Sequence, residues 1–327
     1  MEKNLPSVGD VRSAALRIEG KACKTPVLES SLLNKRLGCR LLVKAESLQR
    51  TGSFKFRGAY NCISRIPEDR RKGGVVAYSS GNHAQGVAAA SQLLGMPALI
   101  VMPEDAPAIK IANTLAYGAE IVFYDRLNEN REEIGEKLVQ QRDATLVRPY
   151  DDGMIIAGQG TVGLEMVQQV QEMDTGMDVF LAPCGGGGLI SGCALALESE
   201  SPDTEIYSVE PQGFDDTARS LQAGDRLSND PSSRSICDAL LTPVPGEITF
   251  SINARLLKGG LSVSDEMAFE AMRIAFEYLK LVVEPGGAVA LAAVLSGQIH
   301  TNDKTIGIVL SGGNVDQDVY IKALGEA

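Results

Sequence analysis

The stretch SFKFRG places Lys55 two residues after Ser53, in the first turn of a predicted helix that Ser53 would cap. The N-terminus of a helix carries partial positive charge, so a cation there is disfavoured by ~0.3–1 kcal/mol unless it is neutralised or turned away. A surface lysine turns away into solvent, whereas a lysine that forms a Schiff base with an aldehyde loses its charge. The segment alone leaves both interpretations open.

A second candidate segment, SSGNHAQG, follows the predicted strand 75–79 and opens a predicted helix. Free backbone N–H groups at the start of a helix can receive a carboxylate. The hydroxyl of Ser80 could donate or relay a proton, and Asn82 could reach a phenolic oxygen on a bound ring. The plainer alternative is a simple N-cap turn. The residues predicted to contact a substrate here are Ser79, Ser80, Gly81, Asn82 and His83.

Four consecutive glycines, Gly185, Gly186, Gly187 and Gly188, follow the predicted strand 179–182 and precede Leu189 at the start of a helix. Such a run lets the backbone approach an oxyanion closely and turns several N–H groups toward it, which predicts a phosphate-binding loop. It is not a Walker loop, because no Gly-Lys-Ser/Thr follows, and its spacing does not match GxGxxG. A flexible turn is the alternative, but ordering four glycines would then cost conformational entropy with no interaction to compensate for it.

Ser311 begins the segment SGGN directly after the predicted strand 305–310. Open α/β sheets bind ligands at the carboxyl ends of their strands. A neutral hydroxyl facing a pyridine nitrogen would leave that nitrogen largely unprotonated, which suits elimination better than full delocalisation of a carbanion. An ordinary glycine turn is the alternative.

Short apolar runs alternate with amphipathic stretches and predict an α/β fold with mainly parallel sheets. Predicted helices cover residues 84–94, 131–141, 160–171 and 265–278, the last with Ser264 at its start. We expect two lobes: residues 1–73 with 151–327 form a large cofactor-binding domain, and residues 74–150 form a small inserted domain that closes the cleft between them. The predicted strands are 41–45, 75–79, 98–102, 120–124, 145–147, 179–182, 205–209 and 305–310.

The composition excludes several classes of protein. A formal charge of −11 over 327 residues argues against nucleic acid or an anionic membrane as partner. No signal peptide or membrane-spanning stretch is apparent. The six scattered cysteines lack zinc spacing and are expected to be reduced thiols in a cytoplasmic protein, and two histidines leave little room for histidine triads.

Taken in order, these segments resemble the fold-type II pyridoxal 5′-phosphate (PLP) enzymes, specifically the serine/threonine dehydratase and serine racemase family. The resemblance spans nearly the whole chain and includes Val283-Glu-Pro285. It implies two open, twisted, mainly parallel sheets as in the tryptophan synthase β fold, and a homodimer. It also implies the following roles: Lys55 as Schiff-base lysine and base, Phe54 against the ring, Ser80 on the opposite face, Asn82 at the ring hydroxyl, Gly185 to Leu189 at the phosphate and Ser311 at the ring nitrogen.

The same family often binds a divalent cation through two carboxylates and a backbone carbonyl. Glu210, Phe214 and Asp216 match that spacing. Oxygen ligands suit Mg²⁺, Mn²⁺ or Ca²⁺, and a solvated acidic turn is the alternative.

Two departures from the family pattern affect the expected substrate and regulation. Cys237-Asp238-Ala239 stands where relatives carry Ala-Asp-Gly, which leaves the substrate open. The chain also lacks the C-terminal extension of biosynthetic threonine deaminases, so feedback control by isoleucine is not expected.

The leading hypothesis is β-elimination from a small β-hydroxy amino acid, with release of a 2-oxo acid and ammonia. Serine or threonine is the family's default substrate. Arg131, Arg148 and Tyr150 could pair with a second carboxylate, which makes 3-hydroxyaspartate a rival, unless Arg131 simply pairs with a neighbouring glutamate. The alternatives are an amino acid racemase, in which Ser80 reprotonates the α-carbon, and a catalytically silent binding protein that keeps the fold.

Overall fold

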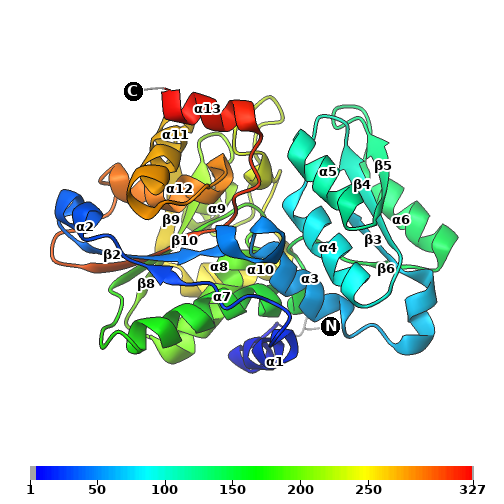
Figure 1. Cartoon of the computed structure of the whole chain (residues 1–327), viewed down its shortest axis with the longest axis horizontal. Helices are drawn as coiled ribbons and strands as arrows, with labels where there is room; N and C mark the ends of the chain where they lie inside the picture. The colour runs from blue at the N-terminus through cyan, green and yellow to red at the C-terminus, as the bar shows by residue number, and fades with distance from the viewer. Residues whose placement is uncertain (1–4, 326–327) are drawn as a thin grey trace.

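Residues 5–325 are described by the computed structural model, and within them ten strands form two separate sheets (Figure 1). The larger sheet has the strand order β1-β2-β10-β7-β8-β9 and is parallel except for the edge pair of β1 and β2. Its strands are β1 (Val27–Leu28), β2 (Arg40–Ala45), β7 (Val179–Pro183), β8 (Glu205–Pro211), β9 (Gly259–Val263) and β10 (Thr305–Leu310).

The smaller sheet has the order β5-β4-β3-β6 and is entirely parallel. Its strands are β3 (Val75–Tyr78), β4 (Ala98–Pro103), β5 (Glu120–Tyr124) and β6 (Thr145–Leu146). The central strands β3 and β4 are buried along their whole length, as expected for parallel strands covered on both faces.

Helices cover both sheets (Figure 1). The helices α4, α5 and α6 lie with the smaller sheet, and most of the others surround the larger one. Their bounds are α1 (Val8–Ile18), α2 (Ser31–Leu37), α3 (Lys55–Ile63), α4 (Asn82–Leu93), α5 (Ala108–Ala116), α6 (Arg131–Arg142), α7 (Gly153–Gln171), α8 (Gly188–Glu200), α9 (Asp216–Ala223), α10 (Glu247–Leu256), α11 (Asp265–Ile274), α12 (Pro285–Leu295) and α13 (Gln317–Gly325).

The larger sheet separates two apolar cores, because successive side chains of a strand point to opposite faces. On β2, Leu41 and Val43 pack in the core formed with α11 and α12. Leu42 between them packs in the core formed with α7 and α8. Burial on both faces therefore fixes the register of the strands whose ends carry the candidate site.

The predicted α/β class and the two mainly parallel sheets are confirmed. All eight predicted strands are present, and Ser264 caps α11 by accepting a hydrogen bond from the Met267 amide. The prediction for α7 was wrong at its start: the helix begins at Gly153, where the Asp152 side chain accepts hydrogen bonds from two amides of the first turn.

Candidate active site

A pocket lies where strand ends of both sheets meet. The segments that follow β3, β7 and β10 all contribute to it, as do the first residues of α3, α4 and α8. Its lining mixes charged, polar and apolar side chains, as the lining of a ligand-binding pocket commonly does. The predicted residues that line it are Phe54, Lys55, Ser79, Ser80, Asn82, His83, Arg131, Gly185, Gly186, Gly187, Gly188, Leu189 and Ser311.

The start of α3 is joined to the end of β10, although the two are far apart in sequence. Ser53 forms an isolated antiparallel bridge with Gly312, and the Phe54 amide donates to the Ser311 carbonyl at 3.1 Å. Ser53 was predicted to cap the helix, and that prediction was wrong. Phe54 occupies the N-cap position, and Ser53 Oγ has no hydrogen-bond partner among the described residues.

Lys55 is the first residue of α3 and its amine is held inside the pocket. Nζ donates to the Pro149 carbonyl at 2.7 Å and lies 5.2 Å from the centroid of the Phe54 ring. Burial lowers the pKa of Lys55 to about 8, because no carboxylate compensates for the lost hydration. The share of neutral, nucleophilic amine at neutral pH is thereby raised by roughly two orders of magnitude over an exposed lysine.

The glycine loop between β7 and α8 fits tightly against its neighbours. A Cβ atom on Gly186 would come within 2.3 Å of the Tyr150 ring, and one on Gly187 within 2.8 Å of Thr249 Cβ. Gly187 also has a φ of +93°, which favours glycine. The residues around the glycine loop therefore leave room for its backbone alone. The loop leads directly into the N-terminus of α8, as an anion-binding loop would.

The segment from Ser79 to His83 turns from β3 into α4 at the pocket. His83 is buried, its Nε2 lies 3.0 Å from the Val147 carbonyl oxygen, and burial together with the nearby Lys55 lowers the pKa of His83 to about 3. It is therefore a neutral side chain. Gly81 does not belong to the pocket lining formed by the described residues; a Cβ there would lie 2.0 Å from Lys110 Cδ.

Both ends of the Asn82 amide are fixed from outside the pocket. Oδ1 accepts from Asn314 Nδ2 at 2.8 Å, and Nδ2 donates to Glu284. Glu284 is itself paired with Lys110 at 2.8 Å. The second hydrogen of Asn82 Nδ2 has no partner among the described residues, and Asn82 is part of the pocket lining.

Two arginines line the pocket and differ in their partners. Arg126 pairs with Asp105 at 3.0 Å and with Asp238 at 3.3 Å. Arg131 pairs with no carboxylate among the described residues, and its guanidinium carbon lies 5.3 Å from the centroid of the Tyr78 ring. The interpretation that Arg131 is engaged by a neighbouring glutamate is therefore wrong. Arg148 is exposed and does not line the pocket.

The sequence interpretation missed part of the pocket wall. Asp238 and Ala239 line it, which confirms only that the Cys237-Asp238-Ala239 departure lies at the site. The pairing of Arg126 with Asp238 joins residues 112 positions apart, and no local pattern signals it. The other lining residues that were not predicted are Tyr78, Pro149, Pro183, Leu240, Leu241 and Thr242.

The predicted metal ligands lie outside the pocket, from Glu210 at the end of β8 through Phe214 to Asp216 at the start of α9. Glu210 is fully buried and accepts hydrogen bonds from the Thr217 and Ala218 amides, and Asp216 accepts one from Asn229. Burial and the mutual repulsion of the two carboxylates raise the pKa of Glu210 well above its usual range, and burial raises that of Asp216 to about 7. Asp216 Oδ2 lacks a partner among the described residues. Within residues 5–325, no group of three His, Cys, Asp or Glu side chains is placed to hold a metal ion.

Comparison with known proteins gives a family and several relatives that the chain matches over nearly its whole length. Residues 18–312 match the family model described as pyridoxal-phosphate dependent enzyme. The chain is 46% identical to L-threo-3-hydroxyaspartate ammonia-lyase of Pseudomonas sp over 98% of its own length and 99% of that protein. It is 40% identical to serine racemase of Schizosaccharomyces pombe over 98% of both chains.

Among solved structures, the T.th. threonine deaminase superposes with a TM-score of 0.89. It shares 46% sequence identity, and the match covers 95% of this chain and 99% of the threonine deaminase chain.

No helix within residues 5–325 is both long and apolar enough to cross a bilayer.

Proposed function

Because this chain belongs to the pyridoxal-phosphate dependent enzymes, we propose that it is an ammonia-lyase that eliminates the β-hydroxyl group of a small β-hydroxy amino acid, releasing a 2-oxo acid and ammonia. One observation carries this conclusion: the desolvated amine of Lys55 and the glycine loop line the same pocket. The likeness to ammonia-lyases speaks against a catalytically silent binding protein.

When bound, pyridoxal phosphate supplies the electron sink that makes the α-proton of the amino acid acidic. The glycine loop and the N-terminus of α8 would hold its phosphate, while Asn82 and Ser311 would hold the ring. The segment from Ser79 to His83 binds the substrate carboxylate. Lys55 Nζ removes the α-proton as a general base, a contribution typically worth ~10²–10⁴-fold.

We propose 3-hydroxyaspartate as the substrate. Of the two arginines in the pocket, Arg126 is already paired with two aspartates. Arg131 has no carboxylate partner among the described residues and is available to bind the second carboxylate of the substrate. Tyr150 lies in the same wall, and burial raises its pKa to about 12, so its phenol stays protonated and can donate a hydrogen bond. The name of the Pseudomonas relative supports the same choice.

Ammonia release from the stereoisomers of 3-hydroxyaspartate, serine and threonine tests this proposal. The wild type is expected to have its highest kcat/KM with a 3-hydroxyaspartate isomer. Arg131→Met should lower that value by ~10- to 100-fold, because a hydrogen-bonded charge pair is lost, and change the value for serine less than ~3-fold. The matched control is Arg70→Met, which removes an exposed arginine outside the pocket lining and should change neither. Preference of the wild type for serine or threonine would reject the arginine argument.

Racemisation is the second candidate activity, since Ser80 lines the pocket and a serine racemase is similar over nearly the whole chain. A hydroxyl on the opposite face from Lys55 would return a proton to the α-carbon. Chiral chromatography of the amino acid left after partial turnover separates the two activities. Unchanged configuration of that amino acid excludes racemisation.

We further propose that Glu210, Asp216 and the Phe214 carbonyl bind a divalent cation such as Mg²⁺, Mn²⁺ or Ca²⁺. Two buried carboxylates with raised pKa values, one with an unpartnered oxygen, favour a nearby positive charge. The Sγ atom of Cys184, next to the glycine loop, lies 3.4 Å from Thr217 Oγ1 in this region. A bound cation would therefore help to fix the position of the loop.

The remaining expectations concern the assembly and its setting. We propose a homodimer, in which residues 74–150 form an inserted domain that closes the cleft. The six cysteines, all free in the structure, support a cytoplasmic setting. Light scattering of the purified protein tests the dimer.

A further inference from the structure

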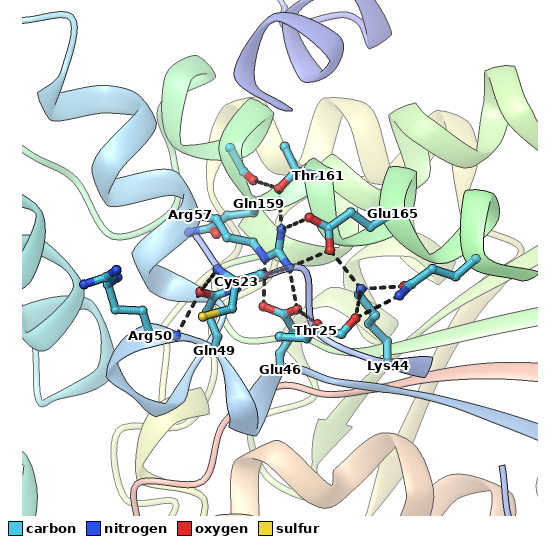
Figure 2. A network of polar contacts seen from close by, with 12 residues as sticks. Cys23, Thr25, Lys44, Glu46, Gln49, Arg50, Arg57, Gln159, Thr161 and Glu165 are labelled. Atoms are coloured by element: carbon cyan, nitrogen blue, oxygen red, sulfur yellow. Dashed lines mark hydrogen bonds and ion pairs between the residues drawn. The ribbon is translucent and has the colours of Figure 1, made fainter. Parts of the chain in front are cut away.

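Four charged side chains, three of them buried and one partly buried, form a cluster beside the first turn of α3 (Figure 2). We call Lys44, Glu46, Arg57 and Glu165 the charge cluster. It contains two cations and two anions, so its formal charge is zero. Arg57 lies at its centre and two residues after Lys55 in the same turn, but no member of the cluster lines the pocket formed by the described residues.

The Arg57 guanidinium is held by carboxylates on two sides. Nε and Nη2 each donate to Glu46 at 2.8 Å, and Nη1 and Nη2 donate to Glu165 at 2.7 and 2.9 Å. Further bonds run from Nη1 to Thr161 and from Nη2 to the Cys23 carbonyl, both at 3.2 Å. Two forked pairs fix the plane of the guanidinium and its rotation, which a lysine ammonium would not do.

The two carboxylate partners of Arg57 belong to different elements. Glu46 follows β2, and Glu165 lies in the middle of α7 (Figure 2). The side chains of Arg57 and Glu46 are completely buried. Because a buried ion pair is often no more stabilising than an apolar pair of similar volume, stability alone does not account for this arrangement. What the pairs add is a defined position of α3 relative to β2 and α7.

Backbone contacts fix the same turn from two other directions. A Cβ on Gly158 of α7 would lie 2.5 Å from the Gly58 Cα atom. A Cβ on Gly86 of α4 would lie 3.0 Å from the carbonyl carbon of Lys55. The turn is thus held by close backbone contacts with α7 and α4 and by the pairs of Arg57 with Glu46 and Glu165.

We propose that Arg57 is a positioning residue for Lys55: by binding Glu46 and Glu165 it sets the first turn of α3, and hence the place of the Lys55 amine. This inference rests on the proposed role of Lys55 as the base. A misplacement of about 1 Å at a reacting group can cost ~10²-fold in rate. We therefore expect the loss of the Arg57 pairs to lower kcat rather than to weaken substrate binding.

The test compares Arg57→Lys with Lys44→Met in the holoenzyme. Lys44 is the other buried cation of the charge cluster; it donates hydrogen bonds to Glu165, Gln169 and the Thr25 carbonyl, and to no described residue of α3. For Arg57→Lys we expect kcat to fall by ~10- to 100-fold with KM changed less than ~3-fold, because position and not binding is lost. Lys44→Met should lower the melting temperature as much and change kcat less than ~3-fold.

Hydrogen–deuterium exchange provides a readout that does not depend on turnover. Amide exchange over residues 55–63 of the apoprotein should speed up by ~10-fold in Arg57→Lys and stay unchanged in Lys44→Met. Equal losses of kcat in the two variants at equal melting temperature, or unchanged exchange in α3, overturn the proposal. If Arg57→Lys does not fold, Glu46→Gln keeps the volume of the partner and takes its place. If the wild type releases no ammonia, the proposed function fails, and exchange alone decides whether Arg57 sets the turn.

Discussion

Lys55 shows how burial can prepare a residue for chemistry. Its amine is removed from water without gaining a carboxylate partner, so the neutral form is favoured more than in an exposed lysine. The sequence indicated this residue because a lysine is unfavourable in the first turn of a helix. It could not indicate Glu46 and Glu165 as partners of Arg57, since those contacts join separate elements.

The lowered pKa of Lys55 predicts how uptake of pyridoxal phosphate by the apoprotein depends on pH. The neutral amine, which attacks the aldehyde, makes up half of the Lys55 side chains at a pH of about 8 and nearly all of them one unit higher. Stopped-flow absorbance should therefore give an uptake rate that is half-maximal near pH ~8 and levels off above pH ~9, whereas a lysine of ordinary pKa would show a rate still rising at pH ~10. Lys55→Ala should show neither the absorbance change nor turnover, and retention of either would remove Lys55 from the mechanism.

At the scale of elements, the sequence predicted the buried strands best because apolar runs between turns are a strong signal. It missed β9, whose residues begin with Gly259 and Gly260, and it missed the true start of α7. The helix α7 carries several glycines that lower its helix propensity, and the Asp152 cap and packing against α3 and α8 decide its start. The glycine loop was predictable because four glycines in a row have few other uses.

The tight fit of the glycine loop gives a prediction for Gly186→Ala. The added Cβ would meet the Tyr150 ring, and overpacking of this kind typically costs ~1–3 kcal/mol. We expect the dissociation constant of pyridoxal phosphate, measured by fluorescence titration, to rise by ~10-fold or more. Gly176→Ala is the matched control, because a Cβ there has nothing within 4 Å and should leave affinity unchanged. Equal affinity in Gly186→Ala and wild type would contradict the role of the loop.

At the scale of the whole molecule, ion pairs connect the two sheets around the site. Lys110 of α5 pairs with Glu284, and the Asp316 carboxylate accepts from the Ala108 and Ile109 amides at the start of α5. Their partners lie about 170 to 210 positions away, so such contacts are visible only in the folded chain. The two-sheet architecture itself was predictable from the alternation of strands and helices.

The proposed cation site gives a prediction for the stability of the whole chain. A ligand present at 100 times its dissociation constant stabilises the folded state by ~2.7 kcal/mol, so Mg²⁺, Mn²⁺ or Ca²⁺ should raise the melting temperature by several degrees. Asp216→Asn should abolish the shift, and Asp215→Asn, which alters a neighbour paired with Arg219, should retain it. A shift that persists in Asp216→Asn places the cation elsewhere.

Borohydride reduction of the holoenzyme, followed by digestion and mass spectrometry, tests most directly whether Lys55 and the glycine loop hold one cofactor. The amine at position 55 should carry the phosphopyridoxyl group, and Gly186→Ala should reduce the labelled fraction at limiting cofactor. A label on another lysine, or none in an active enzyme, would contradict the account.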